Sequence, residues 1–169
     1  MEKRGGRVVS RKLLAALGKV DRSCTQSHIT YTFHIEEPAD QLRIEFSYSP
    51  KLLEDKQAAR EIITVSMERY GYERADSGGG GWEKYAPLQN LLTLSLDDPQ
   101  RHRGAAHRPA PQQRHVIGEG FASPGFVPGA NPAGLWRLTL SLHAVVTETC
   151  DYRIEVWEEE ESDEDVGSV

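Results

Sequence analysis

The most telling segment of this chain is Asn131-Pro-Ala-Gly-Leu-Trp-Arg-Leu-Thr-Leu-Ser-Leu-His143. A Pro-x-Gly turn opens it, and apolar and polar residues then alternate without a break from Leu135 to His143. An alternation with a period of two places one set of side chains on a core and the other set in water. The segment therefore predicts a half-buried β-strand that the chain enters from a tight turn.

Alternation of the same kind occurs in four further segments, residues 28–35, 42–48, 92–96 and 150–156, and two weaker strand candidates are residues 62–67 and 115–117. Gly- and Pro-containing turns separate most of these segments, and little helix is expected between them. We therefore predict an all-β fold: an antiparallel β-sandwich, jelly-roll-like, with about seven or eight strands and one or two short helices.

The remaining segments predict helices and loops. Ser10 is suited to cap a short helix over residues 11–17, and a frayed tail is the alternative for that segment. Residues 51–61 contain good helix formers and predict a short helix or turn. The four consecutive glycines at residues 78–81 predict a flexible loop, because glycine is costly inside a regular element. Residues 101–115 form a Pro- and Arg-rich loop.

Composition indicates one domain with tails. The chain has 169 residues, a net charge of −6 and a mean hydropathy of −0.56. No apolar run approaches the roughly 20 residues of a membrane helix, so no membrane contact is expected. The apolar stretch at residues 13–17 is too short for a signal-peptide core. These features predict a cytoplasmic protein.

The charges are distributed unevenly. Residues 1–22 hold seven Lys or Arg and two acids, whereas residues 158–165 hold seven acids in eight positions. We therefore divide the chain into a basic segment at residues 1–22, a β-sandwich at residues 23–157 and an acidic, disordered tail at residues 158–169. Blocks of like charge usually stay solvated. The alternative is that the two blocks attract each other or a second copy of the chain.

The loop at residues 101–115 is the sharpest binding candidate. It contains four Arg, three His and no acid in a chain that is acidic elsewhere. Guanidinium groups suit phosphate or carboxylate partners. The alternative is a solvated loop, or one that pairs with acids of the same chain. No nucleic-acid binding is expected, because the chain is acidic overall and shows no basic stretch interleaved with aromatic residues.

The histidines show no spacing typical of metal ligands, so no metal or other cofactor is expected. His28, His34 and His143 fall on the polar faces of predicted strands, where solvated histidines are the ordinary reading. A metal site built from outward histidines on adjacent strands stays open as an alternative.

Nucleophilic catalysis finds little support. Ser123 lies in Ala-Ser-Pro-Gly and not in a nucleophile elbow. Cys150 is expected at a buried strand position beside Asp151, which raises its pKa. Asp97-Asp98-Pro99 is read as a turn, with a cation site as the alternative. Cys24 and Cys150 are expected to stay reduced; they could pair only if the first and last strands lie side by side.

An ordered set of short motifs resembles a known module; the motifs are Asn90–Pro99, Arg103–His107, Ala122–Gly129, Pro132–Trp136 and His143. Over residues 28–157 the chain is similar to the N-terminal β-sandwich accessory domain of CehA/McbA-like bacterial metallohydrolases, which belong to the polymerase-and-histidinol-phosphatase (PHP) class. In that family a following domain, rich in His and Asp ligands, carries the chemistry. The resemblance therefore implies the accessory domain and transfers no hydrolase activity.

These observations predict a non-catalytic binding module that contacts a protein partner or a small anionic ligand. The candidate contact residues are Arg101, Arg103, His107, Arg108 and His143. A PHP-type hydrolase or a second copy of the chain is the candidate protein partner. The alternatives are a metal-dependent hydrolase, or a detached subunit of one, and then a carbohydrate-binding module that uses Trp82 or Trp157.

Overall fold

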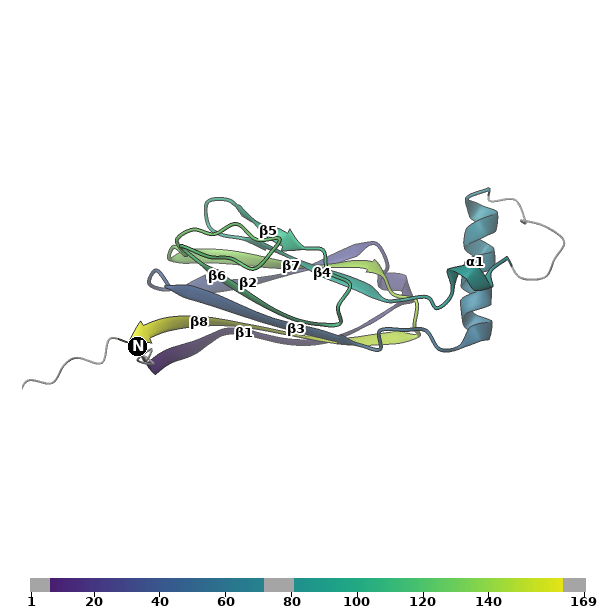
Figure 1. Cartoon of the computed structure of the whole chain (residues 1–169), viewed down its shortest axis with the longest axis horizontal. Helices are drawn as coiled ribbons and strands as arrows, with labels where there is room; N and C mark the ends of the chain where they lie inside the picture. Colours follow the sequence, from purple (N-terminus) through teal and green to yellow (C-terminus); the bar gives the residue numbers. More distant parts are fainter. Residues whose placement is uncertain (1–6, 72–80, 163–169) are drawn as a thin grey trace, which may run out of the picture.

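The computed structural model describes residues 7–71 and 81–162 and contains two four-stranded antiparallel sheets packed face to face (Figure 1). Sheet A contains, in spatial order, β1 (Arg7–Asp21), β8 (Thr149–Ser162), β3 (Gln41–Ser49) and β6 (Gln112–Gly118). Sheet B contains β2 (Ser27–Ile35), β7 (Gly134–Ala144), β4 (Leu91–Asp97) and β5 (His102–Ala106).

The strands pair in a nested order. β1 pairs with β8, β2 with β7, β3 with β6 and β4 with β5, so the first half of the chain pairs with the second half in reverse order. This order is that of an eight-stranded jelly roll. The structure therefore confirms the predicted all-β sandwich. Four of the five clearly predicted strands are only one or two residues longer than expected. The fifth, residues 150–156, lies within the longer β8.

The core lies between the sheets. In β7, Trp136, Leu138, Leu140 and Leu142 are fully buried, whereas Arg137 points to solvent. Phe33 of β2 stacks on Trp136 with 6.1 Å between ring centroids. The alternation read from the sequence thus separates a dry inner face from a wet outer face. Burial of large apolar side chains of this kind stabilises a fold by about 1.5–3 kcal/mol each.

The basic N-terminal segment is a sheet strand, which corrects the predicted helix at residues 11–17 and its frayed alternative. β1 pairs along its length with β8, so the described basic residues lie against the described acidic ones. Lys12 Nζ lies 2.6 Å from Glu155 Oε1, and Arg11 is paired with Glu158. Ladder hydrogen bonds and opposite charges on the facing strand outweigh the local helix preference, because propensity is the weaker term.

The domain boundaries change accordingly. The sandwich includes residues 7–21 and 158–162, which we had assigned to a basic segment and an acidic tail. Of the readings of the charge blocks, the ion pair between Arg11 and Glu158 supports attraction between the two blocks. The disorder expected of the tail at residues 163–169 lies outside the described residues.

The connections also differ from expectation. α1 covers Lys56–Arg69, so residues 62–67 are helical and the expected strand there is wrong. The Asp55 carboxylate caps this helix by accepting from the N–H groups of Gln57 and Ala58. The segment at residues 101–115 is not one loop, because it contains β5 and the first half of β6. Of the glycine run, residues 78–80 lie outside the described residues.

The helix α1 and the short 3-10 helix η2 (Glu83–Tyr85) form an arm that is inserted between β3 and β4 (Figure 1). Figure 1 shows α1 beyond one end of the sandwich and across its long axis. A second 3-10 helix, η1 (Arg22–Cys24), turns the chain from β1 into β2. Within residues 7–71 and 81–162, no helix is long and apolar enough to cross a membrane.

Candidate functional site

Arg103, one of the five predicted contact residues, is fully buried. Its guanidinium donates to the carbonyl oxygens of Gly129 and Ala130, both at 2.9 Å, and to that of Val127 at 3.2 Å. Its Nη1 lies 3.3 Å from the Asp98 carboxylate. Burial lowers the pKa of Arg103, and Asp98 opposes that shift. Arg103 is therefore an internal brace and is removed from the contact surface.

At one end of the sandwich, Arg103 contacts residues from several of the sequence motifs. The guanidinium of Arg103 lies over the ring of Trp136, 5.5 Å from its centroid. Asn131, which is also buried, accepts from Arg103 and donates to the carbonyl oxygen of Ile117 at 3.0 Å. The Asp98 carboxylate also accepts from the N–H groups that follow it in the β4–β5 turn. The turn reading of this aspartate is therefore correct.

Of the other four predicted residues, all are exposed, but they do not form one cluster. Arg101 and Arg108 flank opposite ends of β5, a strand of five residues that spans about 16 Å. Arg101 Nε lies 3.8 Å from Asp98 Oδ2. The rings of His107 and His143 do come together, with 6.0 Å between their centroids.

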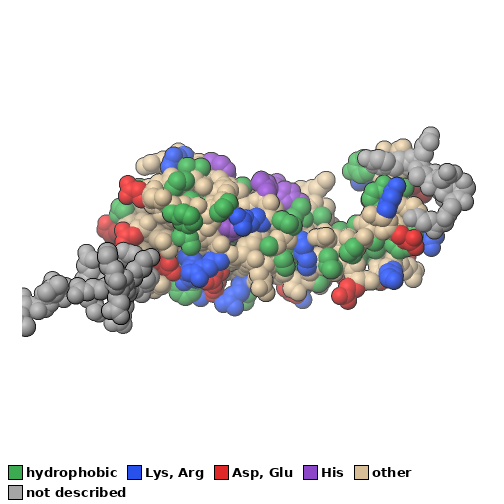
Figure 2. Space-filling view, in the orientation of Figure 1, with side chains coloured by type: hydrophobic (Ala, Val, Ile, Leu, Met, Phe, Trp, Pro, Cys, Tyr) green, Lys and Arg blue, Asp and Glu red, His purple; other side chains and the backbone are tan. Residues whose placement is uncertain are grey.

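A larger surface contains this pair. Outward positions of sheet B, with the residue that follows β5, carry five of the six histidines of the chain: His28, His34, His102, His107 and His143. Figure 2 shows histidines (purple) along the upper margin of the view, over sheet B. We call this surface, with the outward Ser, Thr, Asp97 and Arg137 side chains between them, the histidine face.

Hydrogen bonds between neighbouring strands order the histidine face. Thr30 and Thr139 share a hydrogen bond of 3.0 Å, and His28 Nδ1 lies 3.0 Å from the Ser141 hydroxyl. His102 Nδ1 lies 2.7 Å from the carboxylate of Asp97. Side chains held across strands in this way form a preformed surface with donors and acceptors at fixed spacing.

Arg137 lies on β7 within the histidine face, near the end that holds His34 and His102. It is exposed and stands opposite Asp97 of β4 and Thr32 of β2 in the strand register. No carboxylate of the described residues lies within 4.0 Å of its guanidinium. Sequence reasoning missed Arg137 and His102 as contact residues. The sequence could have indicated Arg137, because it lies six residues before His143 in the alternating strand and so on the same outward face.

The outer face of sheet A has a different character. Its cations Lys12, Arg43, Arg153 and Lys19 each have a carboxylate within 4.0 Å. Lys12 and Arg153 hold Glu155, and their hydrogen bonds lower the pKa of that carboxyl to about 2. Most charges of this face are therefore neutralised by their own neighbours.

The three tryptophans do not form a sugar platform. Trp136 is buried in the core. Trp157 lies on sheet A between Lys12, at 4.4 Å, and Arg43, at 5.0 Å from its ring centroid. Trp82 is half-buried and lies in the arm. The aromatic residues named for a carbohydrate site are thus separated from one another.

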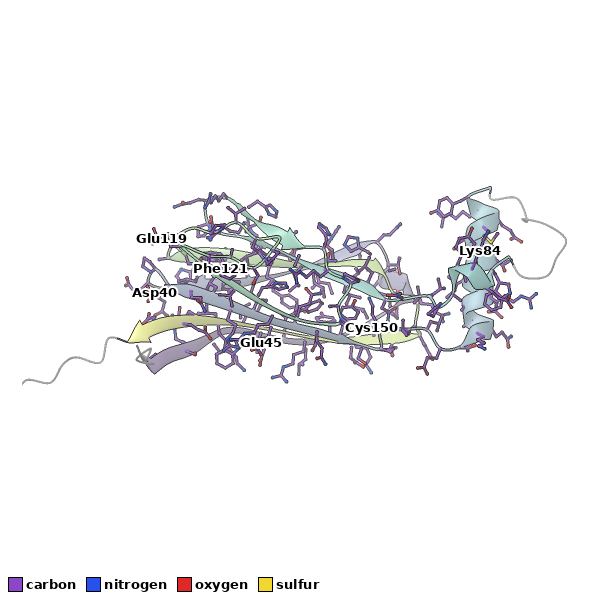
Figure 3. The ribbon with its side chains drawn as sticks, in the orientation of Figure 1. Asp40, Glu45, Lys84, Glu119, Phe121 and Cys150 are labelled. Atoms are coloured by element: carbon purple, nitrogen blue, oxygen red, sulfur yellow. The ribbon has the colours of Figure 1, made fainter. Side chains whose placement is uncertain are left out.

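A second buried polar group sits at the arm end of the sandwich. Asn90 is fully buried; it donates to the carbonyl oxygen of Pro50 at 2.8 Å and to the Thr147 hydroxyl at 2.7 Å, and it accepts from the N–H of Val146 at 2.7 Å. Figure 3 shows the neighbouring Cys150 at this end, whereas Asp40, Glu119 and Phe121 lie at the other end. Asn90 fastens the base of the arm to the β7–β8 connection.

The cysteines are both free, although β1 and β8 are neighbours. Cys150 is fully buried, and its pKa is raised by that burial and by Asp151, as expected from the sequence. A buried thiol with a raised pKa is a poor nucleophile. Cys24 lies in η1 and is half-buried.

Two further features bear on chemistry. Within the described residues, no group of three or more His, Cys, Asp or Glu side chains is placed to hold a metal ion. An apolar groove of about 300 Å³ lies in the arm, between Ile63 and Met67 of α1 and Tyr85 and Leu88 after it.

Comparison with known proteins gives no identity. No family model matches the chain, and no curated protein is significantly similar to it. A crystal structure of a protein from Sulfurospirillum deleyianum aligns over 89% of this chain and 97% of that chain, with 8% identity and a TM-score of 0.27. A likeness this distant carries no argument. The resemblance to the PHP-class accessory domain stays a prediction.

Proposed function

We propose that this protein is a non-catalytic binding module that uses the histidine face to bind an anionic ligand. The observation that carries the proposal is the contrast between the two sheets. Sheet A pairs most of its cations with its own carboxylates, whereas the histidine face holds five histidines and Arg137 against one carboxylate, Asp97.

The chemistry of this face suits oxygen anions. Arg137 offers a guanidinium fork, the donor geometry that matches carboxylate and phosphate. The hydroxyls and imidazoles beside it supply neutral hydrogen-bond donors at strand spacing. Because the whole chain carries −6, a face with a single carboxylate repels an anion less than the acidic parts of its surface.

The rest of the structure supports this use of a sheet face. Arg103 and Asn90 brace the two ends of the sandwich, so the outward side chains stand on a rigid scaffold. A rigid surface binds without a large cost in ordering. We further propose a cytoplasmic location and a PHP-type hydrolase as the protein partner; the alternative is that the chain is a detached subunit of such a hydrolase.

The direct experiment is a titration at low ionic strength with two probes, a decaglutamate peptide and inorganic tripolyphosphate. Arg137→Gln is the test variant, and Arg114→Gln is its control, because Arg114 is an exposed strand arginine on sheet A. We expect binding that weakens with salt and falls by about fivefold or more in Arg137→Gln.

The outcomes separate the sources of the anion. Binding of the peptide alone assigns a carboxylate-rich protein surface, and binding of tripolyphosphate alone assigns a phosphate ligand. Binding of neither probe, or an equal loss in Arg137→Gln and Arg114→Gln, would overturn the proposal.

A further inference from the structure

His107 and His143 make a pair that the binding proposal does not need. They lie at the end of the histidine face nearest the arm, where β4 begins and β7 ends. We propose that these two imidazoles form a site for one divalent transition-metal ion, with Cu²⁺ bound most tightly. The inference stands independently of anion binding, because it rests on this pair and not on Arg137.

The distance between the rings fits a shared ion. Their centroids lie 6.0 Å apart, with 56° between the ring planes. A metal–imidazole bond of about 2.0–2.1 Å puts a ring centroid about 3.2 Å from the ion. Two rings on one ion therefore lie about 4.5 Å apart at the 90° angle of a tetragonal Cu²⁺ site and about 5.2 Å apart at a tetrahedral angle. An approach of roughly 1–1.5 Å closes the site, which rotation of two exposed side chains supplies.

Thr93 holds the ring of His143 through a hydrogen bond. It points outward from β4 but is only 3% exposed, and its hydroxyl lies 2.8 Å from His143 Nε2. When the Nε2–H donates to this hydroxyl, the lone pair of Nδ1 is free for the ion. A metal-binding histidine usually donates its other ring N–H to a neighbour in this way, which fixes its tautomer and orientation.

The donors select the class of metal. Two neutral imidazoles and no carboxylate favour Cu²⁺, Ni²⁺ and Zn²⁺ over Mg²⁺ and Ca²⁺, which prefer oxygen ligands. Among divalent first-row ions, Cu²⁺ binds nitrogen ligands most tightly. With two protein ligands, water completes the coordination, so the site is open.

The test is a Cu²⁺ titration of the full chain, followed by calorimetry and by electron paramagnetic resonance. It uses a Cys24→Ser background, because thiols react with Cu²⁺ and Cys24 is partly exposed. The variants are His107→Ala and His143→Ala. The matched controls are His28→Ala and His34→Ala, which remove exposed histidines of the same face.

We expect one Cu²⁺ per chain with nitrogen hyperfine structure in the spectrum. Each test variant should bind more than about tenfold more weakly, since loss of an outer partner alone costs about 10–100-fold. Thr93→Val should weaken binding without abolishing it. Mg²⁺ should give no signal.

Three results would overturn the site. The first is unchanged affinity in His107→Ala or in His143→Ala. The second is an equal loss in the His28 and His34 controls, which would indicate diffuse binding over the face. The third is the absence of Cu²⁺ binding to the Cys24→Ser chain that keeps all its histidines.

Discussion

Replacing Arg103 should lower the free energy of unfolding of this protein more than replacing any exposed arginine. In Arg103→Ala, three backbone carbonyl oxygens lose their donor, and the Asp98 side chain, which is 2% exposed, loses its buried partner. Removing one member of a buried ion pair costs about 3–5 kcal/mol, because the other charge stays uncompensated. The contact with Trp136 is also lost.

The matched variant is Arg101→Ala. Arg101 contacts the same carboxylate, but its side chain is 54% exposed and the N–O distance is 3.8 Å. Exposed pairs of this kind contribute about 0–1 kcal/mol. Both variants therefore remove a cation from the same aspartate, but only Arg103→Ala removes a buried one together with its hydrogen bonds to three carbonyl oxygens.

The assay is urea unfolding followed by tryptophan fluorescence and repeated by circular dichroism. We expect Arg103→Ala to lower the free energy of unfolding by about 3–5 kcal/mol, which for a chain of this size lowers Tm by about 10 °C. Arg103→Lys should recover only part of the loss, because one ammonium group cannot reach three carbonyl oxygens. A loss in Arg103→Ala within 1 kcal/mol of that in Arg101→Ala would refute the assignment of Arg103 as a brace.

Three other perturbations have defined outcomes. Burial lowers the pKa of His115 from 6.5 to about 4, so between these pH values the unfolded chain binds a proton at His115 that the folded chain does not. The free energy of unfolding should therefore fall by about 3 kcal/mol as the pH drops from 6.5 to 4, and His115→Gln should remove most of this pH dependence in urea unfolding. Gly18→Ala should cost about 1–3 kcal/mol in urea unfolding, because its Cβ would lie 2.2 Å from the ring of Tyr152, whereas Gly120→Ala, with nothing within 4 Å, should be neutral; equal effects would contradict the packing. Asn90→Ala should cost more than about 2 kcal/mol and increase hydrogen exchange at the base of the arm, and an unchanged exchange pattern would argue against its fastening role.

The strands that alternate cleanly were predictable from the sequence, and β7 is the best case. Each of its inward residues is buried and its outward Arg137 is exposed, because the period of two fixes which face a side chain takes. The histidines at positions 28, 34 and 143 were placed on the polar side by the same rule. Many short strands with turns between them predict a sandwich, whereas the nested strand order is seen only in the pairing.

β1 was not predictable from local pattern. Residues 11–17 carry Leu and Ala at spacings that suit a helix, and only the facing β8 makes them a strand. A short stretch of sequence does not show that its residues pair with a strand more than a hundred positions away. Tertiary pairing, and not local propensity, makes this segment a strand.

The candidate site was half predictable for a related reason. The sequence shows that Arg103 lies in a basic segment, but not that its side chain points into the sandwich. Its burial depends on the carbonyl oxygens of Gly129 and Ala130, which a distant loop brings to it. Conversely, His102 was assigned to a loop and lies beside a strand carboxylate, Asp97.

The central claim is that the histidine face is the ligand-binding surface of this protein. The most direct measurement is a titration of the ¹⁵N-labelled chain with decaglutamate or tripolyphosphate, followed by amide chemical shifts. The account predicts shifts that cluster on β2, β4 and β7 around Arg137 and leave the arm and sheet A unchanged. Shifts centred on sheet A or on the groove beside α1 would contradict it.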